Sequence, residues 1–192
     1  MEENRFNETL ESNLSSPIPL LKKLRNLIFG EDSPEVILQV SVYINLIFWF
    51  IFQLWHLISY FAISYRDIIL SEKKINVEIL ILNRGAELGF DPAVFLENLL
   101  TFHKIAIFFW LVVFVGIVMM WRKHRFYLYF LYIPLILHPL TEWYLLGSKY
   151  LMEDSTFFDK LSFFILLVNS IFYSIMVKQQ TNQGADFFQT ED

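Results

Sequence analysis

The chain contains no cysteine and only six glycines, and charged residues occupy just 18% of its 192 positions. The absence of cysteine excludes structural disulfides, thiolate metal centres, iron–sulfur clusters and thiol redox catalysis. Acidic residues outnumber basic ones, and the net charge of −5 provides no basic face that could displace counterions from phosphates. We therefore expect no nucleic-acid partner.

The sequence also lacks the motifs of the common catalytic sites. It contains no glycine-rich phosphate loop, no HExxH zinc motif, no GxSxG nucleophile motif and no acidic cluster suited to magnesium. These absences favour a protein that is not an enzyme. We expect no bound cofactor, and the sequence leaves open whether a metal ion binds.

Apolar and aromatic residues dominate what is present. Hydrophobic residues make up 55% of the chain, which includes 21 Phe, 9 Tyr and 5 Trp. This balance is far too apolar for an ordinary soluble domain, and the length suits one small set of membrane-spanning helices. The composition predicts an all-α integral membrane protein in contact with the lipid bilayer, in a bacterial inner membrane or an organellar inner membrane.

Four long stretches carry almost no charge, as membrane-spanning helices do. We expect one transmembrane domain over 36–177, with spans at about 36–65, 103–121, 126–148 and 158–177. Helices are favoured over barrel strands, because the stretches are long and lipid offers no partner for backbone amides. The four-residue link RKHR forces the second and third spans into an antiparallel hairpin. The sequence therefore predicts an antiparallel bundle of four transmembrane helices.

The N-terminal region predicts a disordered tail over 1–14, followed by an amphipathic helix over 15–30. Leucines share one face of this helix, Gly30 ends it, and its basic residues are placed at the membrane surface: Lys22, Lys23 and Arg25. These residues and the RKHR link place both termini in the cytoplasm by the positive-inside rule. Eight Lys and Arg residues then lie inside and seven outside, so the bias is small.

The outer loop over 66–102 is too long for a plain turn and is expected to be structured. Its segment INVEILIL fits either a short strand or a partly buried helix. Asp91 and Pro92 are typical of a helix cap and a first helical residue, so one helix should run from there into the second span. The polar tail over 178–192 predicts disorder, with the Phe187–Phe188 pair as a candidate docking element.

Polar residues inside the spans fall on defined helix faces. Ser41, Asn45, Gln53, His56 and Tyr60 occupy about a third of the circumference of the first helix at 100° per residue. A narrower stripe on the fourth span consists of Ser162, Asn169 and Tyr173. Both stripes must face protein, water or a ligand, and we expect interhelical polar contacts along them.

Three histidines and one acid form the candidate functional site. His56 and His138 should lie at similar depth, Glu142 one turn beyond His138 on the same face, and His103 at the outer entrance of the second span. Such a cluster could exchange protons, hold a metal ion, ligate haem or serve a quinone. The competing interpretation is that these side chains only hydrogen-bond neighbouring helices.

Two functions are compatible with these features. The favoured one is a non-enzymatic membrane subunit that scaffolds, anchors or helps assemble a respiratory, transport or secretion complex, with other membrane subunits or a second copy as partners. The alternative is a small redox, proton-coupled transport or metal- or haem-binding protein that uses the His/Glu cluster in the outer leaflet.

Overall fold

The computed structural model describes residues 23, 25–30, 35–124 and 126–187, with side chains as far as residue 178. In this part of the chain all regular structure is helical. The helices are α3 (Val36–Ser64), α4 (Arg66–Lys73), α5 (Val77–Leu88), α6 (Pro92–Trp121), α7 (Tyr127–Glu153) and α8 (Phe157–Phe187).

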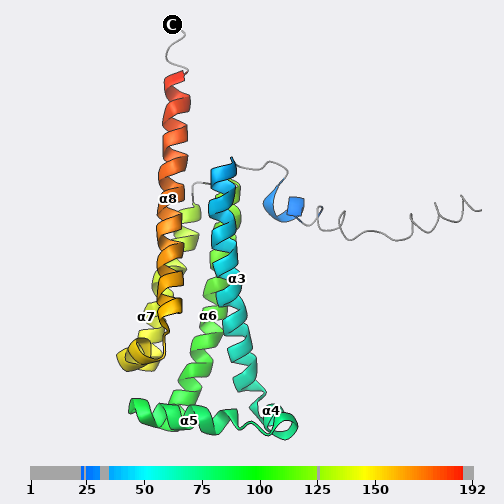
Figure 1. Ribbon diagram of the computed structural model, residues 1–192, viewed down its shortest axis with the longest axis vertical. Helices are drawn as coiled ribbons and strands as arrows, with labels where there is room; N and C mark the ends of the chain where they lie inside the picture. The colour runs from blue at the N-terminus through cyan, green and yellow to red at the C-terminus, as the bar shows by residue number, and fades with distance from the viewer. Residues whose placement is uncertain (1–22, 24, 31–34, 125, 188–192) are drawn as a thin grey trace, which may run out of the picture.

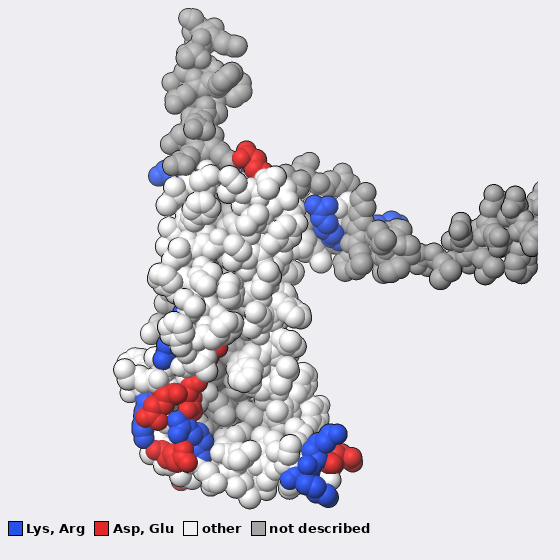
Figure 2. Space-filling model, viewed as in Figure 1, with Lys and Arg blue, Asp and Glu red and all other residues white. Residues whose placement is uncertain are grey.

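Three helices are long and apolar enough to cross a membrane: α3, α6 and the Phe157–Lys178 part of α8. Their outer faces expose large apolar side chains such as Ile47, Phe108 and Phe164, as contact with lipid requires. On the face shown in Figure 2 the middle of the molecule is nearly free of charge, and charged residues lie toward its two ends, with the larger clusters at the lower end. The described part of the chain thus has only helices as regular structure, and its three long apolar helices are those of an integral membrane protein by length and composition.

The predicted third span, 126–148, corresponds to α7, which does not reach the apolarity of the other three. Pro134, Pro139 and Glu142 lie within it, and its C-terminal turns are polar. Length and composition therefore identify three candidate spans among the described residues, where the sequence analysis expected four.

The four long helices lie side by side and alternate in direction (Figure 1). α3 and α7 run one way, and α6 and α8 run the other, while α5 lies across the end at which α3 finishes. α6 packs most extensively, against α7, α3 and α5, and α8 packs chiefly against α3. This arrangement places facing side chains of α3, α6 and α7 in one interior.

The outer segment between α3 and α6 is mostly helical, and its caps explain why. Asn76 caps α5, because its side chain accepts a hydrogen bond from the backbone N–H of Ile79 at 3.0 Å. The segment INVEILIL is therefore helical from Val77 onward and is not a strand. Asp91 accepts from the N–H groups of Ala93 and Val94, and Pro92 is the first residue of α6. The predicted continuous helix is confirmed: at 1.5 Å per residue its 30 residues extend about 45 Å.

α7 is interrupted at Gly147, whose φ of 78° and ψ of 167° are not helical. Only glycine adopts this backbone region readily, because a Cβ would collide with the flanking backbone. The kink turns the last residues of α7 aside, so that the short connection to α8 passes close to the end of α5 (Figure 1).

The two terminal regions differ in part from the sequence-based expectations. Of the amphipathic helix predicted over 15–30, residues 25–29 are helical and Gly30 follows with a φ of 90°, while Lys22 and the predicted tail over 1–14 lie outside the described residues. Arg25 and Phe29 pack against Trp121 at the end of α6. At the other end, α8 is helical as far as Phe187, where the sequence analysis expected disorder from 178. Lys and Gln are good helix formers, and extending an existing helix needs no new nucleus.

Candidate functional site

Three histidines from three helices form a chain in the interior. Nδ1 of His56 on α3 lies 3.0 Å from Nδ1 of His103 on α6. Nε2 of His56 lies 3.0 Å from Nε2 of His138 on α7. All three residues are buried, with exposed fractions of 3% for His56, 5% for His103 and 7% for His138. His56 is therefore the central member, and both of its ring nitrogens are engaged by another imidazole.

The hydrogen-bonding rules of imidazole give this chain two states. A neutral histidine has one N–H donor and one bare nitrogen acceptor, and each nitrogen–nitrogen contact requires one of each. His56 must therefore donate to one neighbour and accept from the other. If it donates to His138, then His103 donates to it; if it donates to His103, then His138 donates to it. The chain has a direction, and reversing that direction changes all three rings.

Aromatic side chains enclose the histidines. The Phe102 ring lies within 5.6 Å, centroid to centroid, of all three imidazoles. Trp110 and Phe163 pack against His138 at 5.8 Å and 5.9 Å. Such walls hold the ring positions and exclude bulk water, so hydrogen bonds inside them are strengthened by a low local dielectric.

A cavity of about 110 Å³ borders all three histidines. Its other walls include Glu142 and Tyr150 of α7, Asp154 in the loop between α7 and α8, and Asp159 in the first turn of α8. The volume is enough for several water molecules, and the walls carry the polar partners that such molecules need. The cavity joins the histidine chain to the polar end of the molecule.

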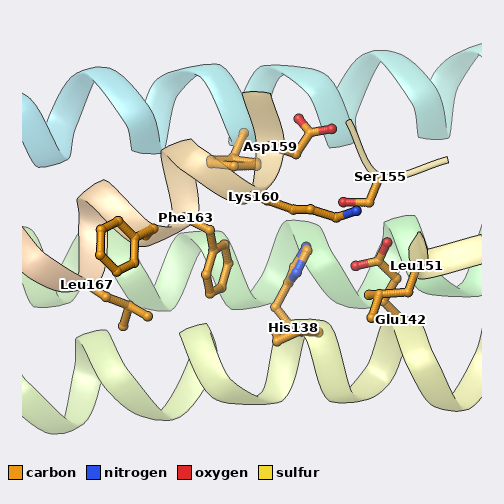
Figure 3. A pocket seen from close by; sticks show the side chains of 11 residues that line it. His138, Glu142, Leu151, Ser155, Asp159, Lys160, Phe163 and Leu167 are labelled. Atoms are coloured by element: carbon orange, nitrogen blue, oxygen red, sulfur yellow. The ribbon is translucent and has the colours of Figure 1, made fainter. Parts of the chain in front are cut away.

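Glu142 lies beside this chain but is not part of it. The Glu142 side chain is half-buried and borders the cavity. Its carboxylate forms no hydrogen bond or ion pair with the described residues around the cavity. It also borders a second pocket of about 350 Å³ between α7 and α8, together with His138 and Lys160 (Figure 3). The i, i+4 relation thus places His138 and Glu142 on the same pocket wall, as helical geometry requires.

The other polar stripe residues form a separate layer, nearer the start of α3. The amide of Asn169 on α8 donates to the Ser41 carbonyl and to Asn45 Oδ1, each at 2.7 Å, and accepts from the Ser41 hydroxyl at 2.8 Å. Tyr173 donates its hydroxyl proton to the carbonyl of Met120. These contacts join α8 to α3 and α6, so in this layer the polar stripes form interhelical hydrogen bonds.

The remaining stripe residues do not belong to either group. Gln53 and Ser162 are buried, and Tyr60 is half-buried with its ring against Phe61. Gln53 Oε1 and Trp110 Nε1 are buried side-chain atoms without a hydrogen-bond partner. The structure therefore brings His56, His103 and His138 together and leaves Gln53, Tyr60 and Ser162 outside that chain.

The histidine geometry does not fit haem or a three-histidine metal centre. In a haem held between His56 and His138, two iron–nitrogen bonds of about 2 Å on opposite sides of the iron would place the nitrogens about 4 Å apart, and they lie 3.0 Å apart. His56 also uses opposite ring nitrogens for its two neighbours, so the three rings do not converge on one point. No group of three or more metal-ligating side chains suited to an ion occurs in the described ranges.

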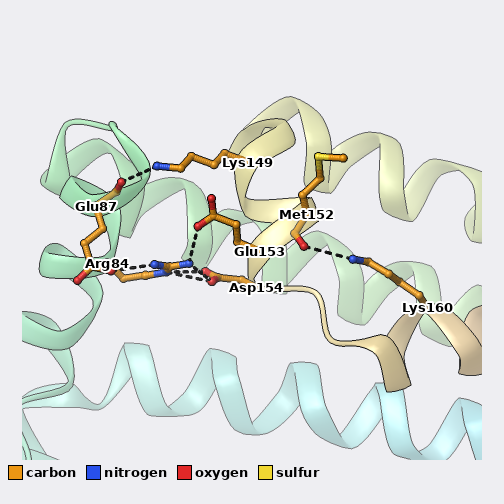
Figure 4. A network of polar contacts seen from close by, with 7 residues as sticks. All are labelled: Arg84, Glu87, Lys149, Met152, Glu153, Asp154 and Lys160. Atoms are coloured by element: carbon orange, nitrogen blue, oxygen red, sulfur yellow. Dashed lines mark hydrogen bonds and ion pairs between the residues drawn. The ribbon is translucent and has the colours of Figure 1, made fainter.

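A cluster of ion pairs joins α5 to the end of α7 beside the cavity (Figure 4). Arg84 on α5 pairs with Asp154, Glu153 and Glu87, and Lys149 donates to the backbone carbonyl of Glu87 at 2.7 Å. Hydrogen bonding to Asp154, then to Glu87, raises the pKa of the Arg84 guanidinium above its ordinary value. Because Asp154 also borders the cavity, this cluster fixes α5 beside the cavity wall.

Sequence reasoning did not identify the residues that complete the cavity. Tyr150 and Asp154 lie beyond the predicted third span, in a polar stretch without a helix-face pattern, and Asp159 lies at the start of the predicted fourth span. Only the kink at Gly147 and the reversal into α8 bring them beside the histidines. Comparison of the chain with protein-family models, curated proteins and solved structures gives no match.

Proposed function

We propose that the protein relays protons through the His103–His56–His138 chain inside the membrane. The observation that carries the proposal is the pair of 3.0 Å nitrogen–nitrogen contacts that engage both sides of His56. A purely structural role needs only that each histidine has some partner, whereas this arrangement links three imidazoles in series. Intramembrane ionisable groups in such interiors commonly mark proton pathways.

The relay follows from the two directions of the chain. In one direction, His103 carries its proton on Nδ1, His56 on Nε2 and His138 on Nδ1. A proton taken up at Nε2 of His103 lets the Nδ1 proton move to Nδ1 of His56. The Nε2 proton of His56 then moves to Nε2 of His138, and the Nδ1 proton of His138 leaves to water or to the Glu142 carboxylate. Each ring ends neutral, and the net result is the transfer of one proton from the α6 side of the chain, through His56 on α3, to the α7 side.

The direction of the chain is reversed after this transfer. Each ring now carries its proton on the opposite nitrogen, so a second proton cannot follow the first until the chain returns to its starting state. Ring rotation would restore it, but Phe102, Trp110 and Phe163 restrict the imidazoles. The chain therefore works as a reversible one-proton shuttle and not as an open pore.

The proposal includes a membrane topology in which α7 is the fourth span of an antiparallel bundle. Residues 127–146 of α7 measure about 30 Å at 1.5 Å per residue, which equals the hydrocarbon thickness of a bilayer. α7 packs along α6 and, with α3, contributes a histidine to the same interior. With both termini cytoplasmic, the histidine cavity opens toward the outer side, where α4 and α5 lie.

Proton movement at His56 is the direct test, because its two nitrogens face only other histidines in the described structure. We would label histidine with ¹⁵N, reconstitute the full chain in bilayers, and measure by solid-state NMR how fast the His56 ring proton exchanges with deuterated water. The relay predicts exchange faster than that of the neighbouring α3 backbone amides. Replacing both ends of the chain, His103→Phe with His138→Phe, should slow the exchange at least tenfold.

His124→Gln is the matched control, since His124 is exposed in the turn after α6 and should leave the exchange unchanged. A fixed His56 tautomer that exchanges no faster than the α3 amides would refute the relay. In that case the histidines would serve only as interhelical hydrogen bonds.

A role as a subunit of a larger complex is the second candidate. The observation in its favour is that α8 continues to Phe187, past the end of its apolar segment at Lys178. This extension offers a helical surface to a partner on the cytoplasmic side in the topology proposed above. Purification from the native membrane in mild detergent, with mass spectrometry of stoichiometric partners, tests it, and it is compatible with the relay.

A further inference from the structure

The pocket of about 350 Å³ between α7 and α8 lies where the histidine chain ends at His138 (Figure 3). We propose that this pocket binds a membrane-soluble quinone, with the ring beside Phe163 and its oxygen atoms toward His138 and Glu142. The inference rests on the proposed relay, since it names a molecule that would form a hydrogen bond with His138, the last histidine of the chain. It rests on the pocket itself for its evidence.

The walls of the pocket suit an aromatic ring with an apolar tail. Phe52, Phe163 and Phe164 line it together with Pro139 and Leu167, and a volume near 350 Å³ lies within the range of small-molecule sites. Phe164 is 62% exposed on the outer face of α8, so one wall continues into the surface that contacts lipid. A ligand dissolved in the bilayer can therefore reach the pocket without crossing water.

The polar end of the pocket favours a neutral head over a charged one. Glu142 and Asp159 supply carboxylates, and Lys160 and Ser155 supply donors, so both signs are present. A lipid phosphate would meet two carboxylates and would have to leave water for an interior lined by aromatic rings, which is costly. A quinone carries no charge and needs only hydrogen bonds. Lys160 can supply one, because its ammonium has three N–H donors and its hydrogen bond to the Met152 carbonyl, at 3.4 Å, uses one of them.

The two directions of the histidine chain suit hydrogen bonds with the oxidised and the reduced form of such a ligand, respectively. Nε2 of His138 is engaged by His56, which leaves Nδ1 for a molecule in the pocket. In one direction Nδ1 carries a proton and can donate to a quinone carbonyl oxygen. In the other direction Nδ1 is bare and can accept from a quinol hydroxyl group. Each form of the ligand therefore favours one direction of the chain.

Binding is tested on the purified full chain in detergent, with a benzoquinone that carries a ten-carbon tail as the probe. Bound quinone is quantified by its absorbance after equilibrium dialysis. Two substitutions fill the pocket from opposite ends, Leu151→Trp beside Glu142 and Leu167→Phe at the apolar end. Each should weaken saturable binding at least tenfold. The control Leu111→Trp, exposed on α6, should change the affinity by less than twofold.

Removing the hydrogen-bonding group should have a smaller effect than filling the pocket. His138→Phe is expected to weaken quinone binding about fivefold while preserving an aromatic ring at that position. Binding that survives both filling substitutions would overturn the assignment, and so would the absence of saturable binding to the unaltered protein. Displacement of the quinone by phosphatidylethanolamine at equal concentration would also overturn it, since the pocket would then be a phospholipid site.

Failure here can be told apart from failure of the relay. If the ring proton of His56 exchanges rapidly but no quinone binds, the relay stands and serves another proton partner. If the quinone binds in this pocket but His56 keeps a fixed tautomer, the binding site stands and the relay is wrong.

Discussion

The hydrogen bonds of Asn169 should account for much of the attachment of α8. Its side chain makes three contacts of 2.7–2.8 Å with Ser41 and Asn45 of α3, and α3 is the helix against which α8 chiefly packs. Interhelical hydrogen bonds in membranes contribute about 0.6 kcal/mol each on average. Asn169→Ala should therefore lower the free energy of unfolding by about 2 kcal/mol, which corresponds to roughly a 30-fold change in the unfolding equilibrium.

Reversible unfolding in mixed micelles, followed by circular dichroism, measures this difference. Val168→Ala is the control, because Val168 lies on the same turn of α8 and its side chain is 46% exposed. The reasoning would be wrong if Asn169→Ala and Val168→Ala differed by less than about 0.5 kcal/mol, below the average for a single such bond. In that case apolar packing, and not the polar layer, would attach α8 to α3.

Three further predictions concern close approaches and the ion-pair cluster. A Cβ at Gly116 would lie 2.9 Å from Leu131 Cγ and 3.0 Å from the backbone of α7, so Gly116→Ala should cost about 1–3 kcal/mol by separating α6 from α7. Thermal unfolding measures this loss. Gly147→Ala should cost about 1–3 kcal/mol, since the φ of 78° and ψ of 167° suit glycine alone. The shift in the thermal unfolding midpoint measures it. Arg84→Gln should speed hydrogen exchange in α5, because it breaks the pairs with Asp154 and its neighbours, and the difference should shrink at high salt.

The raised pKa of Arg84 gives a sign for the pH dependence of that cluster. A cation with a raised pKa in the folded state contributes stability below its unfolded pKa and loses it only as the pH rises through the folded value. For Arg84 both values lie above the working range, so its charge persists at alkaline pH. Exchange in α5 should therefore be constant from neutral to mildly alkaline pH, after correction for the intrinsic rate. An alkaline rise that disappears in Arg84→Gln would contradict this.

Much of the helical framework could be predicted from local sequence. The charge-free runs gave α3, α6 and α8, and Asp91 with Pro92 gave the start of α6, because both signals depend on neighbouring residues only. Gly147 could not be read as a kink, since it packs against Phe90, a residue distant in the sequence, so closely that a Cβ there would lie 2.9 Å from the Phe90 ring. The helical end of α8 was missed because polar composition resembles disorder even where a preceding helix can extend.

The candidate site was only partly accessible to the same reasoning. Counting residues along the spans placed His56 and His138 at similar depth, and the structure puts their ring nitrogens in contact. His103 was placed at the outer entrance of its span, but it lies in the same layer because α6 begins eleven residues earlier, at Pro92. The order of the three histidines depends on side-chain direction and helix packing, which one sequence without relatives does not specify.

The tight connection between α6 and α7 has a consequence for biosynthesis. The backbone N–H of His124 bonds to the Met119 carbonyl and that of Tyr127 to the His124 carbonyl, so α7 begins almost immediately after α6 ends. Alone, α7 carries two prolines and an acidic residue and is a poor candidate for insertion. In the four-span topology proposed above, α7 would enter the bilayer next to the strongly apolar α6, as the second arm of a hairpin. The insertion machinery would then handle the two helices as one unit, and a longer linker after Trp121 would leave α7 outside the membrane.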